Sequence, residues 1–322
     1  MHNSQDGAEV AKDFNGNLTA TPNAHLTVSS CLGCHNGYAP GAPNIFGATA
    51  ATRTAGGTFA ASVVGSDPSR VHNVRDIAAA NGGPGWTTDE TTLFTKYPGS
   101  DGSKLTALTG ATNLNCAGAT GCHGDHSAAN TNSDLGIKGF HHGEKTGYRY
   151  LQSYDGTTGT PIAGLEEATW EYGGATPTKH NVYASDTTGT ANNSISDLCA
   201  TCHAKFHGTT NTQGTDANGN SVWIRHPTEN LLSSTSWTLA SLNIDPDKDP
   251  LAFDPASNYN TVTTASSYDG TSTGAAVACV SCHRAHGTDY SDILRFNYAD
   301  QVAGSTTTST GCLGCHYKQR GS

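Results

Sequence analysis

Four pentapeptides in this chain place two cysteines three positions apart and a histidine directly after the second cysteine. They run from Cys31 to His35, Cys199 to His203, Cys279 to His283 and Cys312 to His316. On a helical turn, residues three and four apart face the same way, so two thiols and one imidazole converge on one patch. Such a patch suits two thioether bonds to haem vinyl groups and one axial bond to iron, the attachment pattern of c-type haem.

A fifth, wider copy runs from Cys116 to His123, where the second cysteine, Cys122, lies six positions after the first. An α-helix of 3.6 residues per turn cannot bring these two thiols onto one face, so we expect the intervening residues to loop out. Gly118 and Gly121 make the loop feasible, because glycine tolerates positive φ values. The alternative for this copy is a disulfide beside a free histidine.

With the wide copy included, the ten cysteines form five pairs, and the sequence predicts five covalent haems. The predicted thioether cysteines are Cys31, Cys34, Cys116, Cys122, Cys199, Cys202, Cys279, Cys282, Cys312 and Cys315. The predicted proximal iron ligands are His35, His123, His203, His283 and His316.

Other uses of paired cysteines explain the pattern less well. Structural zinc needs two such pairs to complete four ligands, and it gives no reason for a histidine after every second cysteine. A disulfide framework, expected in small secreted chains, leaves that histidine unexplained as well. A thioredoxin-like redox site needs one pair beside a βαβ pattern, whereas this chain has several pairs and no such pattern.

The remaining histidines supply candidates for the sixth iron position. Methionine cannot serve, since Met1 is the only one in the chain. Ten histidines remain for five irons, so every haem can be ligated by two histidines, which favours low potentials and leaves no open site for a substrate. The candidates are His2, His25, His72, His126, His141, His142, His180, His207, His226 and His286.

Three of these candidates follow a proximal histidine closely. His126 and His286 come three residues after one, and His207 comes four after another. Each leaves its own haem's turn and is placed to reach a neighbouring iron, although a surface or hydrogen-bonded histidine is the alternative. For His25, His141, His142 and His180 that ordinary role is favoured.

The composition predicts that cofactors supply much of the core. Leu, Ile, Val and Phe make up only 46 of 322 residues, a level at which a charged chain without cofactors tends toward disorder. We therefore predict one domain, residues 1–322, of mostly irregular backbone with little sheet, wrapped around a chain of haems. Single turns should carry most motifs, and one longer helix is expected over 195–206, capped by Ser196 or Asp197.

Charge and hydropathy restrict the partners and the compartment. The formal net charge of −10 makes nucleic acid an unsuitable partner. No apolar run approaches the roughly 18 residues of a membrane span, and the polar start of the chain contains no signal-peptide core. Because haem attachment normally follows export, we expect a location outside the cytoplasm. The chain is then either a mature or trimmed one without its targeting segment, or one with a misplaced start.

The chain resembles the extracellular filament-forming multihaem c-type cytochromes, most closely their six-haem type. Cys31 to His35 with His72 resembles that family's second haem region, and Cys122-His123 with His126 its third. The other similar regions are Cys199 to His203 with His207 and Arg225-His226-Pro227, Cys279 to His286 with Leu294-Arg295-Phe296-Asn297, and Cys312 to His316.

One departure from the family concerns the start of the chain. In the family, Met-His-Asn-Ser follows a first haem motif, whereas here Met1 to Ser4 opens the chain and that motif is missing. The resemblance implies that His2 crosses the subunit boundary and ligates the His283 haem of a neighbouring subunit. The other distal ligands that it implies are His72, His126, His207, His226 and His286. These are six ligands for five irons, so one is spare or serves a haem attached upstream.

A ligand shared between identical subunits implies a head-to-tail contact that grows into an open filament. The leading hypothesis is therefore a non-enzymatic, polymeric extracellular conductor, a nanowire, that carries respiratory electrons from the cell surface to an outside acceptor. The alternatives are a monomeric periplasmic electron shuttle, a multihaem reductase with one open haem and, more remotely, an adhesive surface protein.

Overall fold

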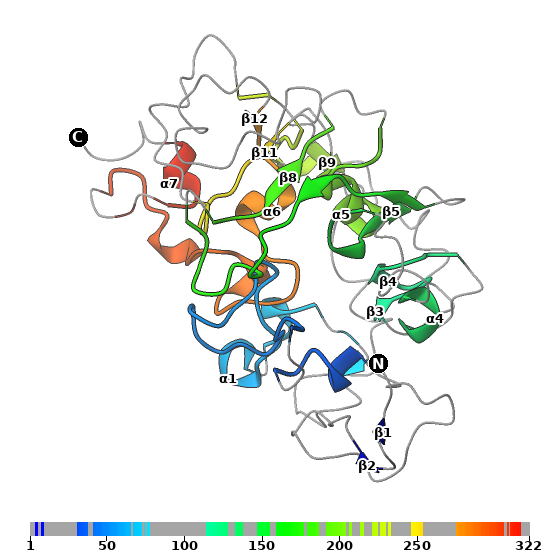
Figure 1. The fold of residues 1–322 in the computed structure, drawn as a ribbon. Helices are drawn as coiled ribbons and strands as arrows, with labels where there is room; N and C mark the ends of the chain where they lie inside the picture. The colour runs from blue at the N-terminus through cyan, green and yellow to red at the C-terminus, as the bar shows by residue number, and fades with distance from the viewer. Residues whose placement is uncertain are drawn as a thin grey trace.

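The structure is a computed structural model, and its described part is dominated by irregular backbone, short helices and short strands (Figure 1), which confirms the expected fold class. It describes residues 4–5, 8–9, 31–37, 41–65, 67–72, 74, 76–77, 114–127, 133–137, 147–154, 159–176, 179–186, 191–203, 206–207, 213–215, 221–224, 226–229, 231–232, 246–253, 275–305, 308 and 310–316. The extent of the single domain stays a prediction.

The helical elements are short. The α-helices are α1 (Ala61–Val64), α4 (Ser133–Ile137), α5 (Ile195–His203), α6 (Cys279–Cys282) and α7 (Cys312–Cys315). The 3-10 turns are η1 (Cys31–Gly33), η2 (Pro68–Arg70), η4 (Tyr148–Tyr150), η10 (Ser291–Ile293) and η11 (Tyr298–Asp300). Single turns thus carry three of the motifs, as the sequence predicts.

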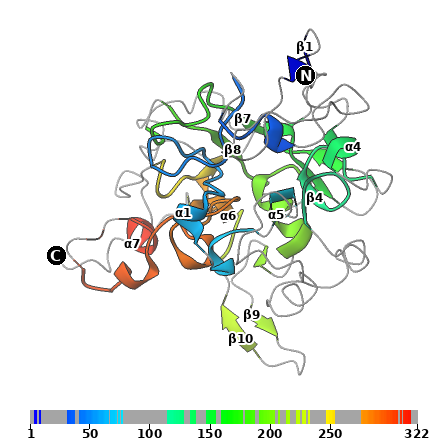
Figure 2. The ribbon, with the colours of Figure 1, turned by 90° about the horizontal axis from the view of Figure 1, so that it is seen from below.

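Most strands pair as small ribbons. The strands are β1 (Ser4–Gln5), β2 (Ala8–Glu9), β3 (Asn115–Ala117), β4 (Gly121–His123), β5 (Gln152–Tyr154), β6 (Gly159–Pro161), β7 (Gly164–Leu165), β8 (Val182–Ala184), β9 (Gln213–Thr215), β10 (Ser221–Ile224), β11 (Ala252–Phe253) and β12 (Ala275–Ala276). The pairs β1–β2, β5–β6 and β9–β10 are antiparallel, and β9–β10 projects from the molecule in Figure 2.

One sheet has four strands, in the order β12-β11-β8-β7. Tyr183 of β8 pairs with Gly164 of β7 on one side and with Ala252 of β11 on the other, and Ala252 also pairs with Ala276 of β12. Ala252 and Ala276 are fully buried, so small side chains let other segments pack closely on the sheet. Because only two residues, Val277 and Ala278, separate β12 from α6, this sheet fixes the position of the Cys279 motif.

Helix α5 begins at Ile195, where the sequence predicts it, but its cap differs from the prediction. Ser194 is the capping residue, because its hydroxyl accepts from the Asp197 amide at 3.0 Å while the Asp197 carboxylate accepts from the Ser194 amide at 2.9 Å. This reciprocal pair is a capping box. Ser196 and Asp197 therefore lie inside the helix, and the described α-helix ends at His203 rather than at Phe206.

Two apolar clusters hold the elements around the motifs. The larger contains Tyr148, Leu151, Ile162, Tyr183, Ile195, Ala252, Ala278 and Val280, and it joins η4, the four-stranded sheet, α5 and α6. The smaller contains Leu32, Phe59, Val74, Ile77 and Leu114, with Cys116 packed against it. Each cluster thus lies where two motifs from distant parts of the sequence come together.

Candidate functional site

Three of the regular motifs close in the same way. The amide of the histidine donates to the carbonyl of the first cysteine: His35 to Cys31 at 2.9 Å, His283 to Cys279 at 3.1 Å and His316 to Cys312 at 2.7 Å. This bond four residues back closes one α-helical turn. The turn places both cysteine side chains and the imidazole on one side, as covalent haem attachment requires.

The wide copy reaches the same result with strands. β3 and β4 run parallel, with Asn115 opposite Gly121 and Ala117 opposite His123, so Cys116 lies opposite Cys122. Facing residues of parallel strands project to the same side, at a strand spacing of about 4.8 Å. The intervening residues loop out as predicted, with Gly118 at a φ of 90°. The spacing that excludes a helix is thus accommodated by a tight parallel turn.

The ten cysteines are all described, and all are free thiols. Burial raises the pKa of Cys282 to about 12, with smaller contributions from Cys312 and Cys315. Burial also raises the pKa of Cys202 to about 12. Such thiols stay protonated at neutral pH, which disfavours a reactive redox cysteine at these two positions.

Thiols of successive motifs lie beside one another. In each neighbouring pair, one thiol and burial together raise the pKa of the other thiol. These pairs are Cys31 with Cys116, Cys122 with Cys202, Cys199 with Cys279, and Cys282 with Cys312. The motifs therefore adjoin in the order of the sequence, and α7, α6, α5 and β3–β4 follow one another across the molecule in Figures 1 and 2.

Backbone carbonyls hold three of the five predicted proximal histidines. Nδ1 lies 3.1 Å from the Pro43 oxygen in His35, 2.9 Å from the Arg149 oxygen in His123 and 2.7 Å from the Asp292 oxygen in His283. A carbonyl can only accept, so Nδ1 carries the proton and Nε2 keeps its lone pair. This arrangement is typical of metal-ligating histidine, whose second nitrogen donates to a carbonyl or carboxylate.

Three histidine pairs join a predicted proximal residue to a predicted distal one. The ring centres are 6.3 Å apart for His72 and His203, 6.5 Å for His123 and His286, and 6.4 Å for His226 and His316. A metal bonded on opposite sides by two imidazole nitrogens at about 2 Å separates the ring centres by roughly 6 Å. The three pairs therefore have the spacing that one iron between them requires.

Two of the three pairs contain a histidine whose pKa keeps it neutral at neutral pH. Burial lowers the pKa of His203 to about 4, with His72 and His283 adding to the effect. Burial likewise lowers the pKa of His286 to about 3, and His123 is the next contributor. Neutral imidazole is the form that ligates a metal, so these sites are ready for iron at neutral pH.

The other predicted distal histidines are not in such pairs in the described part of the chain. His126 is buried between the carbonyls of Gly118 and Gln152, at 3.0 and 2.9 Å from its two nitrogens. His207 lies 3.6 Å from an Asp197 oxygen. The Nδ1 atom of His180 lies 2.8 Å from the Asn181 oxygen. His2, His25, His141 and His142 lie outside the described residues.

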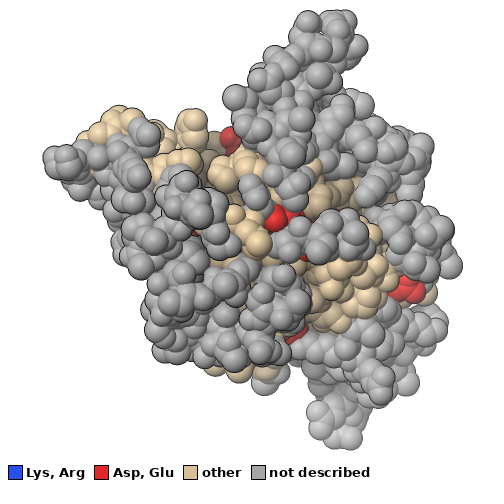
Figure 3. All heavy atoms as spheres, turned by 90° about the horizontal axis from the view of Figure 1, so that it is seen from above, with Lys and Arg blue, Asp and Glu red and all other residues tan. Residues whose placement is uncertain are grey.

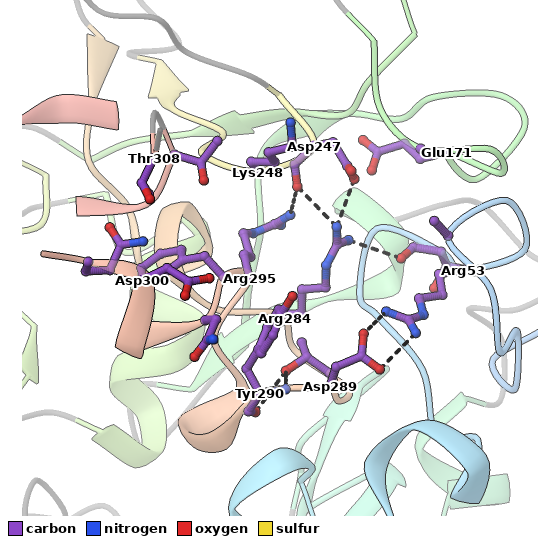
Figure 4. Close-up of a pocket in the computed structure, with 18 residues that line it drawn as sticks. Arg53, Glu171, Asp247, Lys248, Arg284, Asp289, Tyr290, Arg295, Asp300 and Thr308 are labelled. Carbon is purple, nitrogen blue, oxygen red and sulfur yellow. Dashed lines mark hydrogen bonds and ion pairs between the residues drawn. The ribbon is translucent and has the colours of Figure 1, made fainter. Parts of the chain in front are cut away.

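Arginines anchor the segment around His283 (Figure 4). Arg284 donates to the Asp247 carboxylate at 2.8 Å and to the Ala55 carbonyl at 3.1 Å, and Arg295 donates to the carbonyls of Val280 and Asp247 at 2.6 and 2.8 Å. Both arginines also line a cavity of about 280 Å³.

Figure 3 shows acidic side chains among the described residues on the face drawn there, in keeping with the net charge.

Sequence reasoning did not identify the groups that hold the motifs. The first cysteine of two motifs donates its amide to a side chain: Cys116 to the Asp76 carboxylate at 2.9 Å, and Cys279 to the Ser196 hydroxyl at 3.3 Å. The carbonyls of Pro43, Arg149 and Asp292 were missed as well. Since every residue has a carbonyl, no residue type in the sequence marks the ones that meet an imidazole.

Residues 273–321 match the family described as Doubled CXXCH motif. Among solved structures, the chain is similar to the Outer Membrane Cytochrome S Filament from Geobacter sulfurreducens, with 20% identity over 50% of this chain and 43% of that chain and a TM-score of 0.32. The chain thus matches less than half of that structure's length. No curated protein matches it.

In the described part of the chain, no helix has the length and apolarity needed to cross a membrane.

The matched stretch, 273–321, contains two of the five motifs, Cys279 to His283 and Cys312 to His316. The doubled motif and the spacing of the histidine pairs both suit the same group. The doubled motif indicates covalently bound c-type haem, and the chain carries several copies of the motif.

Proposed function

We propose that this chain is an electron-transfer protein that holds five c-type haems between pairs of histidines. The observation that carries the proposal is the spacing of three histidine pairs, 6.3 to 6.5 Å between ring centres, each pair containing one motif histidine. When bound, haem supplies one-electron redox chemistry. The protein's part is to attach the group, fill both axial positions and exclude water.

The proposal assigns each residue a role. The ten cysteines form the thioethers, and the motif histidines provide the proximal ligands. Three distal ligands follow from the histidine pairs. His72 is the distal ligand at the site of His203, His286 is the distal ligand at the site of His123, and His226 is the distal ligand at the site of His316. For the sites of His35 and His283, the candidates are His2, His126 and His207, and the family resemblance favours His2 of a neighbouring subunit for His283. No residue is assigned a catalytic role.

Adjoining motifs support a continuous path for electrons. Thiols of each motif lie beside thiols of the next, from Cys31 to Cys116 at one end and from Cys282 to Cys312 at the other. Groups attached to neighbouring thiols lie close together, and electron tunnelling falls steeply with distance. Five haems in sequence order would therefore conduct along the subunit, which a protein built for a single site would not need.

The larger proposal is that subunits polymerise head to tail into an extracellular conductive filament. If His2 ligates the His283 haem of the next subunit, the contact does not close on itself and propagates as a helix. The filament would be exported through the periplasm and meet redox partners at the cell surface. A monomeric periplasmic shuttle is the second candidate, because it needs the same ligands without the shared one.

The ligand assignment is tested with His286→Ala. In this variant we expect the single haem of the His123 site to change from low spin to high spin, as measured by electron paramagnetic resonance. The same haem should then bind carbon monoxide. Phe59→Leu is the matched control, because Phe59 stacks on the His286 ring at 4.7 Å but provides no ligand. A fully low-spin His286→Ala protein would contradict the assignment, and a high-spin haem in the wild type would favour a reductase.

The filament is tested separately with His2→Ala, compared with the wild type by light scattering and electron microscopy. The wild type is expected to form fibres, and the variant to polymerise weakly and to show one high-spin haem. Wild-type protein that stays monomeric and forms no fibres would reject the filament and support the shuttle, without affecting the ligand assignment.

A further inference from the structure

Two proximal histidines, His123 and His283, are held by turns that have the same geometry and unrelated sequences. The turn beside His123 is η4 and its successor, Tyr148 to Leu151. The turn beside His283 is η10 and its successor, Ser291 to Leu294. Both are followed by a leucine that bridges antiparallel to the histidine: Leu151 to His123 and Leu294 to His283.

Three contacts correspond one to one between the two turns. The second residue of the turn offers its carbonyl to the histidine Nδ1, at 2.9 Å from Arg149 and 2.7 Å from Asp292. The third residue accepts from the amide that follows the histidine: Tyr150 from Gly124 at 2.7 Å, and Ile293 from Arg284 at 2.9 Å. In both turns the leucine amide donates back to the first residue.

The backbone of these turns is unusual. Arg149 and Tyr150 have φ values of 50° and 60°, and Asp292 and Ile293 have values of 59° and 48°. Two consecutive non-glycine residues in the left-handed region are uncommon, and a β-branched residue such as Ile293 is a genuine outlier there. Such conformations persist only where the surroundings over-determine them, and they cluster at functional sites.

Each turn is anchored by arginine. The Arg149 side chain donates to Glu166 at 3.2 Å and to Asn181 at 2.8 Å, and its guanidinium lies 4.1 Å from the Trp170 ring centre. Near the other turn, the amide of Arg295 donates to Cys282 at 2.9 Å, and its side chain donates to the carbonyls of Val280 and His283. The anchors keep the strained carbonyl in place against the imidazole.

We propose that the two left-handed turns, Arg149–Tyr150 and Asp292–Ile293, are positioning elements that lock the Nδ1–H of His123 and His283 onto a carbonyl and thereby lower the potentials of their haems. A held Nδ1–H fixes the plane of the ring and makes the ligating nitrogen more basic, which favours oxidised iron. The inference rests on the proposed function, since it requires these histidines to ligate iron.

The sharpest test changes the backbone of one turn and leaves the histidine in place. Proline at position 293 cannot adopt a positive φ, whereas asparagine tolerates it well. In Ile293→Pro we expect an unchanged haem count, a positive shift of one haem's potential in a spectroelectrochemical titration, and an altered low-spin resonance for that haem. Ile293→Asn, which also removes the isoleucine side chain, should match the wild type.

Tyr150→Pro and Tyr150→Asn test the turn at the wide motif in the same way. Here the proline variant should shift the potential of the haem of His123. If both variants of a pair shift equally, the side chain rather than the turn is responsible, and the proposal is wrong. If the proline variants keep every wild-type potential and resonance, it is also wrong. A wild-type protein that shows no haem signal at all would instead reject the proposed function.

A measurement on the unmodified protein guards against misfolded proline variants. His286 is the internal reference, because its Nδ1 is buried with no hydrogen-bond partner among the described residues. In the reduced, diamagnetic protein, the Nδ1–H resonances of His123 and His283 should lie downfield of that of His286. Equal shifts for the three protons would overturn the proposal.

Discussion

The wide motif around Cys116 and the regular motif around Cys279 solve the same geometrical problem with different backbones. Parallel strands β3 and β4 place Cys116 opposite Cys122, whereas one helical turn, α6, brings Cys279 and Cys282 to one side. The histidines that follow are nevertheless held alike, each by a carbonyl in a left-handed turn. In these two motifs the spacing and backbone of the thiols differ, whereas the acceptor of the imidazole is the same.

The two motifs also differ in what receives the amide of the first cysteine. Cys116 donates to the Asp76 carboxylate, which also accepts from Ser133 at 2.8 Å. Cys279 donates to Ser196, whose hydroxyl in turn bonds Glu229. Glu229 is 2% exposed. Both motifs thus begin at an acidic network, but the second network is buried and its charge is expensive to hold there.

Loss of a haem is the largest effect that can separate the two motifs. Cys116→Ala with Cys122→Ala, and Cys279→Ala with Cys282→Ala, should each reduce the haem content by one per chain. Intact mass and the absorbance of the denatured protein measure this content. The second double variant is the control for the first. Wild-type content in the Cys116 and Cys122 variant would show that the wide motif carries no haem.

A smaller effect is expected when the strands of the wide motif are forced apart. A Cβ on Gly121 would lie 2.5 Å from the Ala117 backbone. Gly121→Ala should therefore separate β3 from β4, lower stability by about 1–3 kcal/mol and reduce attachment at this motif. Thermal unfolding and haem content measure the two effects.

Gly304→Ala is the control for this variant, because Gly304 has a φ of 86° and no atom within 4 Å of the added Cβ. It should lose about 1 kcal/mol through backbone strain alone and keep its haem content. An unchanged haem content in Gly121→Ala would mean that the facing arrangement of Cys116 and Cys122 is not required for attachment.

The last effect concerns the pH dependence of stability at the Cys279 motif. Burial raises the pKa of Glu229 to about 7, above its value of roughly 4.3 in an unfolded chain. Between these values the folded state binds more protons, so the free energy of unfolding should fall as pH rises from about 4 to about 7, by up to about 3 kcal/mol. Glu229→Gln should remove this decline in denaturant titrations. An identical pH profile in the variant would exclude Glu229 as its source.

The sequence predicts the haem chemistry better than the local structure that supports it. The cysteine and histidine spacing predicts the motifs, the single turns and the loop between Cys116 and Cys122. It also locates the start of α5, because Ile195 opens a periodic apolar pattern. The predicted cap of this helix is wrong. Ser194, Ser196 and Asp197 are all suitable capping residues, and only the tertiary fold selects Ser194, because it turns Ser196 toward Cys279.

The sequence by itself determined the proposed attachment residues, because thioether formation and axial ligation depend on residue type and on short spacings along the chain. Only the tertiary structure decided which histidines face each other. His72 and His203 are more than a hundred residues apart in the chain, but their ring centres lie 6.3 Å apart. It also decided which carbonyls hold the imidazoles of His123 and His283. Such pairings depend on how distant segments pack, and a backbone carbonyl, which every residue has, leaves no mark in the sequence.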